Sequence, residues 1–257
     1  MKGFWEYLIK GIPIGMANTL PGVSGGTVAL ILRIYERLIN SIKNLNLRML
    51  IPIGIGAVIG VGVSSKLIIG LLESNLRGFM LALLLGLIFA SSKITADQVE
   101  NFNFKSIFLA IVGLIFTYFY SIDIDTVVLT SDISLARFFF GGTIGSIAMI
   151  LPGVSGGTLL IMLGLYQGVL EAISTLNIIV LLVFGFGVGV GLLIFSWTLS
   201  YLLNRYNSPV MAFLTGLILG SMRSVLPDSL GLLEIIGFVL GGFIIWRLDK
   251  NRILGEI

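Results

Sequence analysis

The chain has 257 residues, of which 56% are hydrophobic and 11% charged, with a mean hydropathy of +1.07 and a net charge of +3. This balance excludes an ordinary soluble domain, and the 16 basic residues are spread too evenly to form a stripe that binds nucleic acid. The absence of cysteine and histidine excludes disulfides, thiolate chemistry and the usual metal ligands, so we expect no metal site and no cofactor.

The first apolar run, Gly11 to Leu20, leads into the string PGVSGGT at Pro21–Thr27, and a short apolar arm, Val28 to Leu32, follows. Proline lacks the N–H of a helix hydrogen bond and glycine leaves the backbone loosely held, so this string interrupts a helix. Both arms are too short to cross a bilayer, which takes about 20 residues. Because irregular backbone is tolerated in a bilayer only inside protein or along a cavity, the pattern predicts a re-entrant helical hairpin with the break at its tip.

Six longer apolar stretches follow, and we interpret them as spans near residues 49–72, 77–92, 104–121, 178–203, 209–226 and 231–248. The same seven-residue string returns between the third and fourth of these, at Pro152–Thr158. Its apolar arms are longer than those of the first copy, so a hairpin and a full crossing both remain open there. Two identical helix-interrupting strings in so apolar a chain indicate a functional site.

The repeat extends beyond the string. When the two copies of the string are aligned, Tyr35 matches Tyr166, and after a slip of one position Lys93 matches Arg223. We interpret the chain as a duplicated unit, residues 1–122 and 135–257, joined by an external linker at 123–134. Each hairpin returns the chain to the side from which it entered and three crossings follow, so the second unit is predicted to lie upside down. The fold class is an all-α polytopic membrane protein of two inverted repeats, each a re-entrant helical hairpin plus about three transmembrane helices.

Two glycine series lie in the first long span of each unit: Gly54, Gly56, Gly60 and Gly62, and Gly185, Gly187, Gly189 and Gly191. Three positions of the first series match the second in the same alignment as the strings. Because small residues let helix backbones approach closely, we interpret both series as packing faces between helices.

Basic residues favour one side of the predicted topology. The side that holds the N-terminus collects twelve: Lys2, Lys10, Arg33, Arg37, Lys43, Arg48, Lys93, Lys105, Arg205, Arg247, Lys250 and Arg252. The other side holds four, Lys66, Arg77, Arg137 and Arg223. By the positive-inside rule we expect a multi-pass protein of the cytoplasmic membrane with both termini in the cytoplasm.

The two strings have the pattern of an anion site. In each copy a serine, Ser24 or Ser155, is placed as the N-cap of a helix that opens with two glycines and a threonine. The first-turn N–H groups have no partner within the helix, and glycine lets a phosphate or carboxylate approach them closely. The candidate ligand-binding residues are Pro21, Gly22, Ser24, Gly25, Gly26, Thr27, Pro152, Gly153, Ser155, Gly156, Gly157 and Thr158. The alternative is that the glycines only allow tight packing and the hydroxyls satisfy each turn internally.

Charged side chains supply further candidates. Lys93 and Arg223 occupy matching positions on opposite predicted faces, and we expect them to capture an anion from either side. Alternatively, each complements a helix C-terminus or extends to the membrane interface. Glu36 and Glu171 are candidates for coupling transport to H⁺ or Na⁺, the alternative being that they lie at helix ends among the lipid headgroups.

Inverted repeats with broken helices indicate a secondary transporter rather than a receptor or channel. A transporter of a small soluble anion, such as a carboxylate or inorganic phosphate, would use the same backbone donors. An intramembrane serine hydrolase is a third class, but without histidine only a serine–lysine pair would activate the nucleophile. Duplication of the string also argues against a single nucleophile.

The residues Gly15-Met16, Pro21–Thr27, Ala29 and Tyr35-Glu36, together with Ala148–Gly156 and Gly164–Tyr166, resemble the polyprenyl-phosphate transporter family, formerly a membrane family of unknown function. The resemblance covers nearly the whole chain and implies inverted repeats with re-entrant hairpins. It also implies a polyprenyl phosphate substrate, such as undecaprenyl phosphate, returned across the cytoplasmic membrane for recycling of the lipid carrier. The headgroup would then pass a midplane site by alternating access while the isoprenoid tail stays among membrane lipids.

Overall fold

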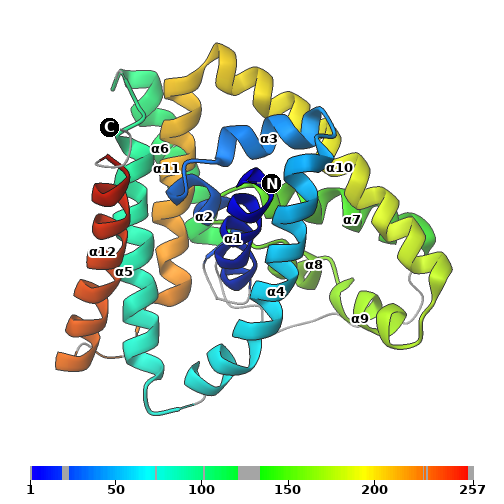
Figure 1. Cartoon of the computed structure of the whole chain (residues 1–257), viewed down its shortest axis with the longest axis horizontal. Helices are drawn as coiled ribbons and strands as arrows, with labels where there is room; N and C mark the ends of the chain where they lie inside the picture. Colours follow the sequence, from blue (N-terminus) through cyan, green and yellow to red (C-terminus); the bar gives the residue numbers. More distant parts are fainter. Residues whose placement is uncertain are drawn as a thin grey trace.

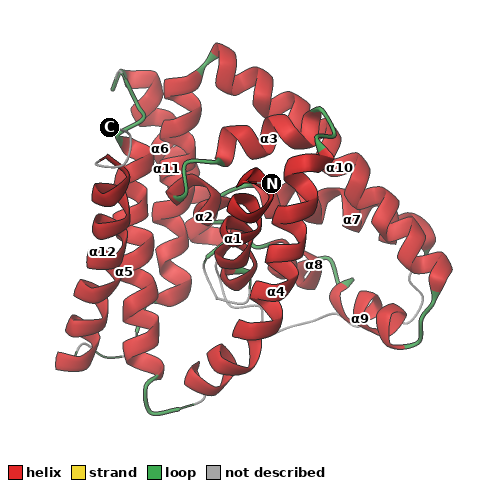
Figure 2. Cartoon of the chain, viewed as in Figure 1, coloured by secondary structure: helices red, strands yellow, loops and turns green. Residues whose placement is uncertain are grey.

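The computed structural model describes residues 2–18, 23–72, 74–100, 102–120, 134–227, 229 and 231–253, and within them every regular element is a helix (Figure 2). The first half of the chain forms α1 (Lys2–Ala17), α2 (Gly25–Ile31), α3 (Tyr35–Lys43), α4 (Leu47–Leu72), α5 (Arg77–Ala96) and α6 (Phe104–Tyr120). The second half forms α7 (Leu135–Ile150), α8 (Gly156–Met162), α9 (Tyr166–Ser174), α10 (Ile178–Arg205), α11 (Asn207–Ser221), the short 3₁₀ helix η1 (Met222–Val225) and α12 (Leu232–Ile253). The all-α class predicted from the sequence is confirmed.

Four helices are long and apolar enough to cross a membrane within the described residues: the Leu47–Ser64 part of α4, α5, α10, and α11 with η1. They confirm the predicted spans near 49–72, 77–92, 178–203 and 209–226. The spans predicted near 104–121 and 231–248 fall on α6, which has 17 residues, and on α12, which has 22. α8 and α9 meet at an angle of 104°, so they form either a broken span or a re-entrant segment, and this bend lies after the second string rather than in it. The chain is therefore a multi-pass membrane protein.

The two halves repeat the same backbone turns. Arg33 (φ 51°) and Gly164 (φ 66°) are left-handed, and they occupy matching positions when the two strings are aligned. Leu45 (φ 50°) and Leu176 (φ 51°) form a second left-handed pair in the same alignment. Left-handed backbone is uncommon outside glycine, so two matched pairs support the duplication inferred from sequence.

Helix pairing repeats as well. α1 packs on α4 as α7 packs on α10, whereas α5 packs on α12 and α11 packs on α6, so the last helix of each half joins the other half. In Figure 1, α5 runs upward and its counterpart α11 runs downward, the relation that inversion requires. The inversion relative to a membrane and the division at 123–134 stay predictions, because residues 121–133 lie outside the described part of the chain.

Half of the glycines in the two predicted packing faces lie close to a neighbouring helix. A Cβ at Gly56, Gly60, Gly187 or Gly191 would collide with a backbone carbonyl of the facing helix, whereas Gly54, Gly62, Gly185 and Gly189 face open space. The packing prediction is thus right for the first four and wrong for the others. The reason is that residues two apart point to nearly opposite sides of a helix.

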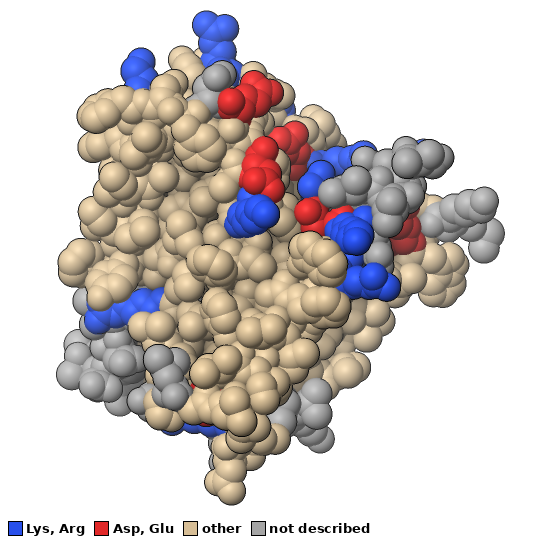
Figure 3. Space-filling model, turned by 90° about the vertical axis from the view of Figure 1, so that its left-hand side faces the viewer, with Lys and Arg blue, Asp and Glu red and all other residues tan. Residues whose placement is uncertain are grey.

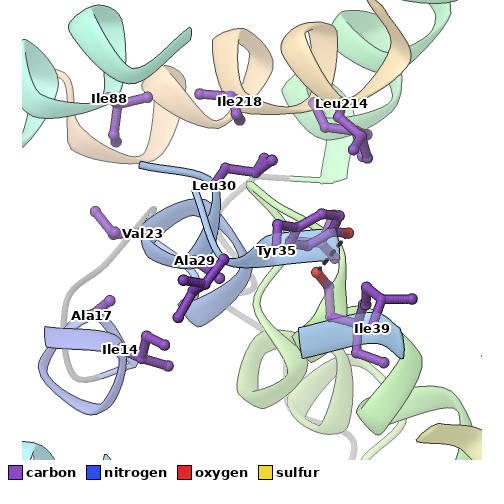
Figure 4. Packing of buried hydrophobic residues seen from close by; sticks show 14 of the residues in the cluster. Ile14, Ala17, Val23, Ala29, Leu30, Tyr35, Ile39, Ile88, Leu214 and Ile218 are labelled. Carbon is purple, nitrogen blue, oxygen red and sulfur yellow. Dashed lines mark hydrogen bonds between the residues drawn. The ribbon is translucent and has the colours of Figure 1, made fainter. Parts of the chain in front are cut away.

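The core lies where the broken helices meet α5 and α11. In Figure 4, Leu30 of α2 points toward Ile218 of α11, and Tyr35 at the start of α3 lies near Leu214. All four side chains are buried. This core holds α2, and with it the end of the first string, against the second half of the chain.

Charged side chains gather toward one end of the molecule. α5, α10 and α12 end at the upper side of Figure 1, and α11 begins there. On the face seen in Figure 3, charged side chains lie mainly in the upper half, and a broad area is uncharged. The predicted distribution of twelve basic residues against four requires this polarity. The cytoplasmic placement of that end stays a prediction.

Candidate functional site

Both copies of the string interrupt a helix and start a new one, as predicted. α2 begins directly after Ser24, whose Oγ accepts the backbone N–H of Thr27 at 3.2 Å. α8 begins directly after Ser155, whose Oγ accepts the N–H of Thr158 at 3.3 Å. Each serine is thus the N-cap that the sequence predicts. Pro21 and Gly22, the other candidates of the first copy, lie outside the described residues.

The two strings touch each other. The backbone N–H of Gly153 donates to Ser24 Oγ and to Thr27 Oγ1, each at 3.1 Å. The Ser24 hydroxyl donates to the carbonyl of Leu151 at 3.2 Å. Gly26 packs so closely against the carbonyl of Ile150 that a Cβ would not fit there. Side chains of the first copy therefore hold the turn of the second.

Most polar groups of the first copy have partners inside the protein, although a small cavity of about 160 Å³ borders Gly25 and Gly26. Ser24 is 4% exposed and Thr27 is 2% exposed. The N–H of Gly25 donates to the side-chain oxygen of Asn18 at 3.3 Å. Both hydroxyls and two of the first-turn N–H groups of α2 consequently have partners inside the protein.

The second copy is open. Pro152 and Gly153 are buried in the turn, but Ser155 is exposed and Gly157 and Thr158 are half-buried. Among the described residues, the backbone N–H groups of Gly156 and Gly157 donate to no protein acceptor. A Cβ at Gly157 would meet only Ser155 Oγ, at 3.8 Å. The space that a ligand atom can enter therefore lies at Gly157, whereas Gly156 beside it is buried, with Met149 and the carbonyl of Gly145 close by.

Three polar residues at the strings were not predicted as site residues. Asn18 contacts Gly25, the hydroxyl of Tyr35 donates to the carbonyl of Ile150 at 3.2 Å, and the hydroxyl of Tyr120 donates to the carbonyl of Ser155 at 2.6 Å. Tyr35 carried a signal, because it matches Tyr166 in the repeat. Asn18 carried none, because its counterpart in the repeat is Met149.

The structure does not bring Lys93 and Arg223 to the strings. Lys93 is exposed on α5 and lines a groove of about 500 Å³ between α5 and α12. Arg223 lies over the ring of Tyr118 in α6, with its Cζ 4.3 Å from the ring centroid. Within the described residues neither side chain makes a hydrogen bond or an ion pair with a string residue.

The candidate coupling carboxylates also lie apart from the strings. Glu36 is exposed at the start of α3 and accepts a hydrogen bond from the side-chain amide of Asn207 at 3.4 Å. Glu171 is exposed on α9. Their assignment to ion coupling stays a prediction.

Comparison with known proteins gives a consistent picture. A family model described as undecaprenyl phosphate translocase-like matches residues 14–50 and 42–236. The chain is 33% identical over 239 residues to a protein of Vibrio cholerae named Polyprenyl-phosphate transporter, a match that covers 85% of this chain and 76% of the relative. It is 31% identical over 280 residues to a protein of Staphylococcus aureus with the same name, covering 98% of each chain. No solved structure matches.

Proposed function

The chain belongs to the undecaprenyl phosphate translocase-like family, and we propose that it moves undecaprenyl phosphate or another polyprenyl phosphate between the leaflets of the cytoplasmic membrane. Two relatives that match most of the chain are named polyprenyl-phosphate transporters. The apolar surface of the helices suits a substrate whose tail stays in lipid. Return of the lipid carrier for reuse is the process that this activity would serve.

The observation that carries the proposal is the open end of α8. We place the phosphate at the N–H groups of Gly156 and Gly157, with the hydroxyls of Ser155 and Thr158 as further donors. A charge at the bilayer centre costs about 2.5–3.5 kcal/mol or more. Each charge-assisted hydrogen bond returns about 1.5–3 kcal/mol, so a few such bonds offset a large part of that cost. The first copy of the string then supports the site rather than mirroring it.

The finer steps belong to the same proposal. The phosphate site becomes exposed to either leaflet in turn, with Lys93 and Arg223 receiving headgroups at opposite ends and both termini in the cytoplasm. Inward movement of an anion opposes an inside-negative potential by about 2.3 kcal/mol per charge per 100 mV. Cotransport of H⁺ or Na⁺, with Glu36 or Glu171 as the carboxylate, would offset this.

Two other functions, a carrier of small soluble anions and a serine hydrolase, explain fewer of the observations. A carrier of small soluble anions would use the same donors but would not need a site that opens to lipid. A serine hydrolase needs a base at the nucleophile, and among the described residues neither Ser24 nor Ser155 hydrogen-bonds a lysine, aspartate or glutamate side chain. The names of the relatives favour transport.

Transport is tested in proteoliposomes that contain a fluorescent polyprenyl phosphate, using the membrane-impermeant reductant dithionite. In protein-free vesicles dithionite bleaches the outer leaflet alone. With the protein present, we expect bleaching of both leaflets for the phosphate but not for the matching polyprenol. Uptake of labelled inorganic phosphate or carboxylate, without exchange of the lipid, would establish the soluble-anion alternative instead.

A further inference from the structure

Arg33 occupies a backbone position that suits glycine. At the end of α2, the N–H of Arg33 donates to the carbonyl of Leu30 at 2.8 Å and that of Ile34 to the carbonyl of Ala29 at 3.0 Å. At the end of α8 the same two bonds, 2.9 and 2.8 Å long, form around Gly164. A left-handed residue in such a cap is free for glycine and costly for any residue with a Cβ. The first copy therefore has an arginine at a position where the second copy forms the same turn with glycine.

The side chain of Arg33 reaches the second half of the chain. Its Nη2 lies 2.9 Å from Oδ1 of Asp249 in α12. Asp249 lines the groove between α5 and α12, and so does Lys93. Within the described residues Lys93 makes no ion pair. Lys93 thus lines the groove, and Arg33 reaches a residue that lines it.

The groove has a charged end and an apolar part. α5 and α12 run in parallel, since Gly78 faces Glu234 and Gly86 faces Phe238. The ends of both helices therefore lie together, which places Lys93 of α5, and Asp97 directly after it, beside Trp246 and Asp249 of α12. The rest of the lining, deeper along both helices, includes Phe89, Phe238 and Val239.

The lining itself carries one cation, Lys93, and two carboxylates, Asp97 and Asp249. Two further cations lie beside it, since Arg33 pairs with Asp249 and Lys250 lies over the ring of the lining residue Trp246 at 5.1 Å. Since Asp249 already accepts from Arg33, an incoming phosphate that takes its place meets both Arg33 and Lys93. Phosphate suits this exchange because it accepts the planar guanidinium in the same paired geometry as a carboxylate.

We propose that the α5–α12 groove binds the polyprenyl phosphate at the end of the molecule where these charges gather, with the phosphate between Lys93 and Arg33 and the first isoprenoid units along Phe89 and Phe238. Asp249 holds Arg33 at the groove until the phosphate displaces it. A volume of about 500 Å³ takes the headgroup and the start of the tail, and the remainder stays in lipid. This inference rests on the proposed function and adds the residues that select the substrate at the groove.

Trp246 provides a direct readout of docking. Replacing Trp5 and Trp197 by phenylalanine leaves it as the single tryptophan of the full chain. In lipid nanodiscs, undecaprenyl phosphate is expected to change the Trp246 emission in a saturable way. Undecaprenol and phosphatidylglycerol at equal mole fraction are expected to leave it unchanged. An equal response to phosphatidylglycerol would make the groove a general phospholipid site and overturn the proposal.

Variants separate docking from a merely structural ion pair. Lys93→Gln and Arg33→Gly are each expected to raise the mole fraction of undecaprenyl phosphate needed for half-saturation by about tenfold or more, because each removes one charge-assisted contact. Asp249→Asn is expected to lower that mole fraction, because the carboxylate that competes with the phosphate for Arg33 is removed. Arg37→Gln, an exposed arginine on α3, is the matched control and should bind as the parent does.

The proposal requires Arg33→Gly and Asp249→Asn to change binding in opposite directions. If Arg33→Gly and Asp249→Asn change binding in the same direction, the pair only holds α12 in place and the proposal fails. Unchanged binding in Lys93→Gln overturns it as well. Leaflet exchange by the unmodified protein is measured in parallel. Exchange that persists while docking at the groove fails contradicts this inference alone, whereas loss of exchange in the unmodified protein contradicts the proposed function.

Discussion

At the scale of single residues, the two identical strings have different environments. Ser24 is enclosed and bonds to Leu151 and Gly153 of the other copy, whereas Ser155 is exposed. The N-cap role of both serines could be predicted from sequence, because it depends on the residues that follow each one directly. Their burial could not, since it depends on contacts with the other half of the chain.

Alanine substitutions are expected to separate the two serines. Ser24→Ala removes the acceptor of two buried N–H groups, and we expect a loss of about 1–3 kcal/mol in the free energy of unfolding. Ser155→Ala removes an exposed cap and should cost about 0.5–1 kcal/mol. Thermal unfolding of both variants in one detergent compares them. A larger loss for Ser155→Ala would contradict the enclosed position of Ser24.

At the scale of helices, the apolar runs predicted the long spans because length and composition alone decide whether a helix crosses a membrane. The pairing of helices was not predictable in the same way. α5 packs on α12 and α11 on α6, across the two halves, and the α5–α12 groove exists only because of that exchange. No local pattern in either helix specifies its partner, so Lys93 could be named from the repeat but its groove could not.

The glycine pairs give a test at this scale. Gly187→Ala would place a Cβ against the carbonyl of Phe139, whereas Gly185→Ala, on the same helix, enters open space. We expect Gly187→Ala to lose about 1–3 kcal/mol of unfolding free energy through overpacking. Gly185→Ala should be neutral or slightly stabilising, because alanine favours the helix. Equal melting temperatures for the two variants would show that α7 and α10 do not pack in the way described.

At the scale of the whole molecule, duplication was predictable because the string, the tyrosines and the cations recur at a nearly constant offset. The left-handed pairs, such as Leu45 and Leu176, give the same offset in the backbone. What sequence could not predict is the asymmetry between the copies. The serine of the first string is buried and that of the second is exposed, and the site proposed for the phosphate lies in the second string, at Gly156 and Gly157.

The measurement that tests this most directly is leaflet exchange of fluorescent polyprenyl phosphate by Gly157→Val, compared with Gly189→Val. Both glycines are helical, and a Cβ at either meets no backbone within 4 Å. We expect both variants to melt near the unmodified protein. Gly157→Val should lose at least about tenfold in exchange rate, because its side chain covers the donors that hold the phosphate, while Gly189→Val keeps the full rate. Full exchange by a folded Gly157→Val protein would contradict the account and place the phosphate site elsewhere.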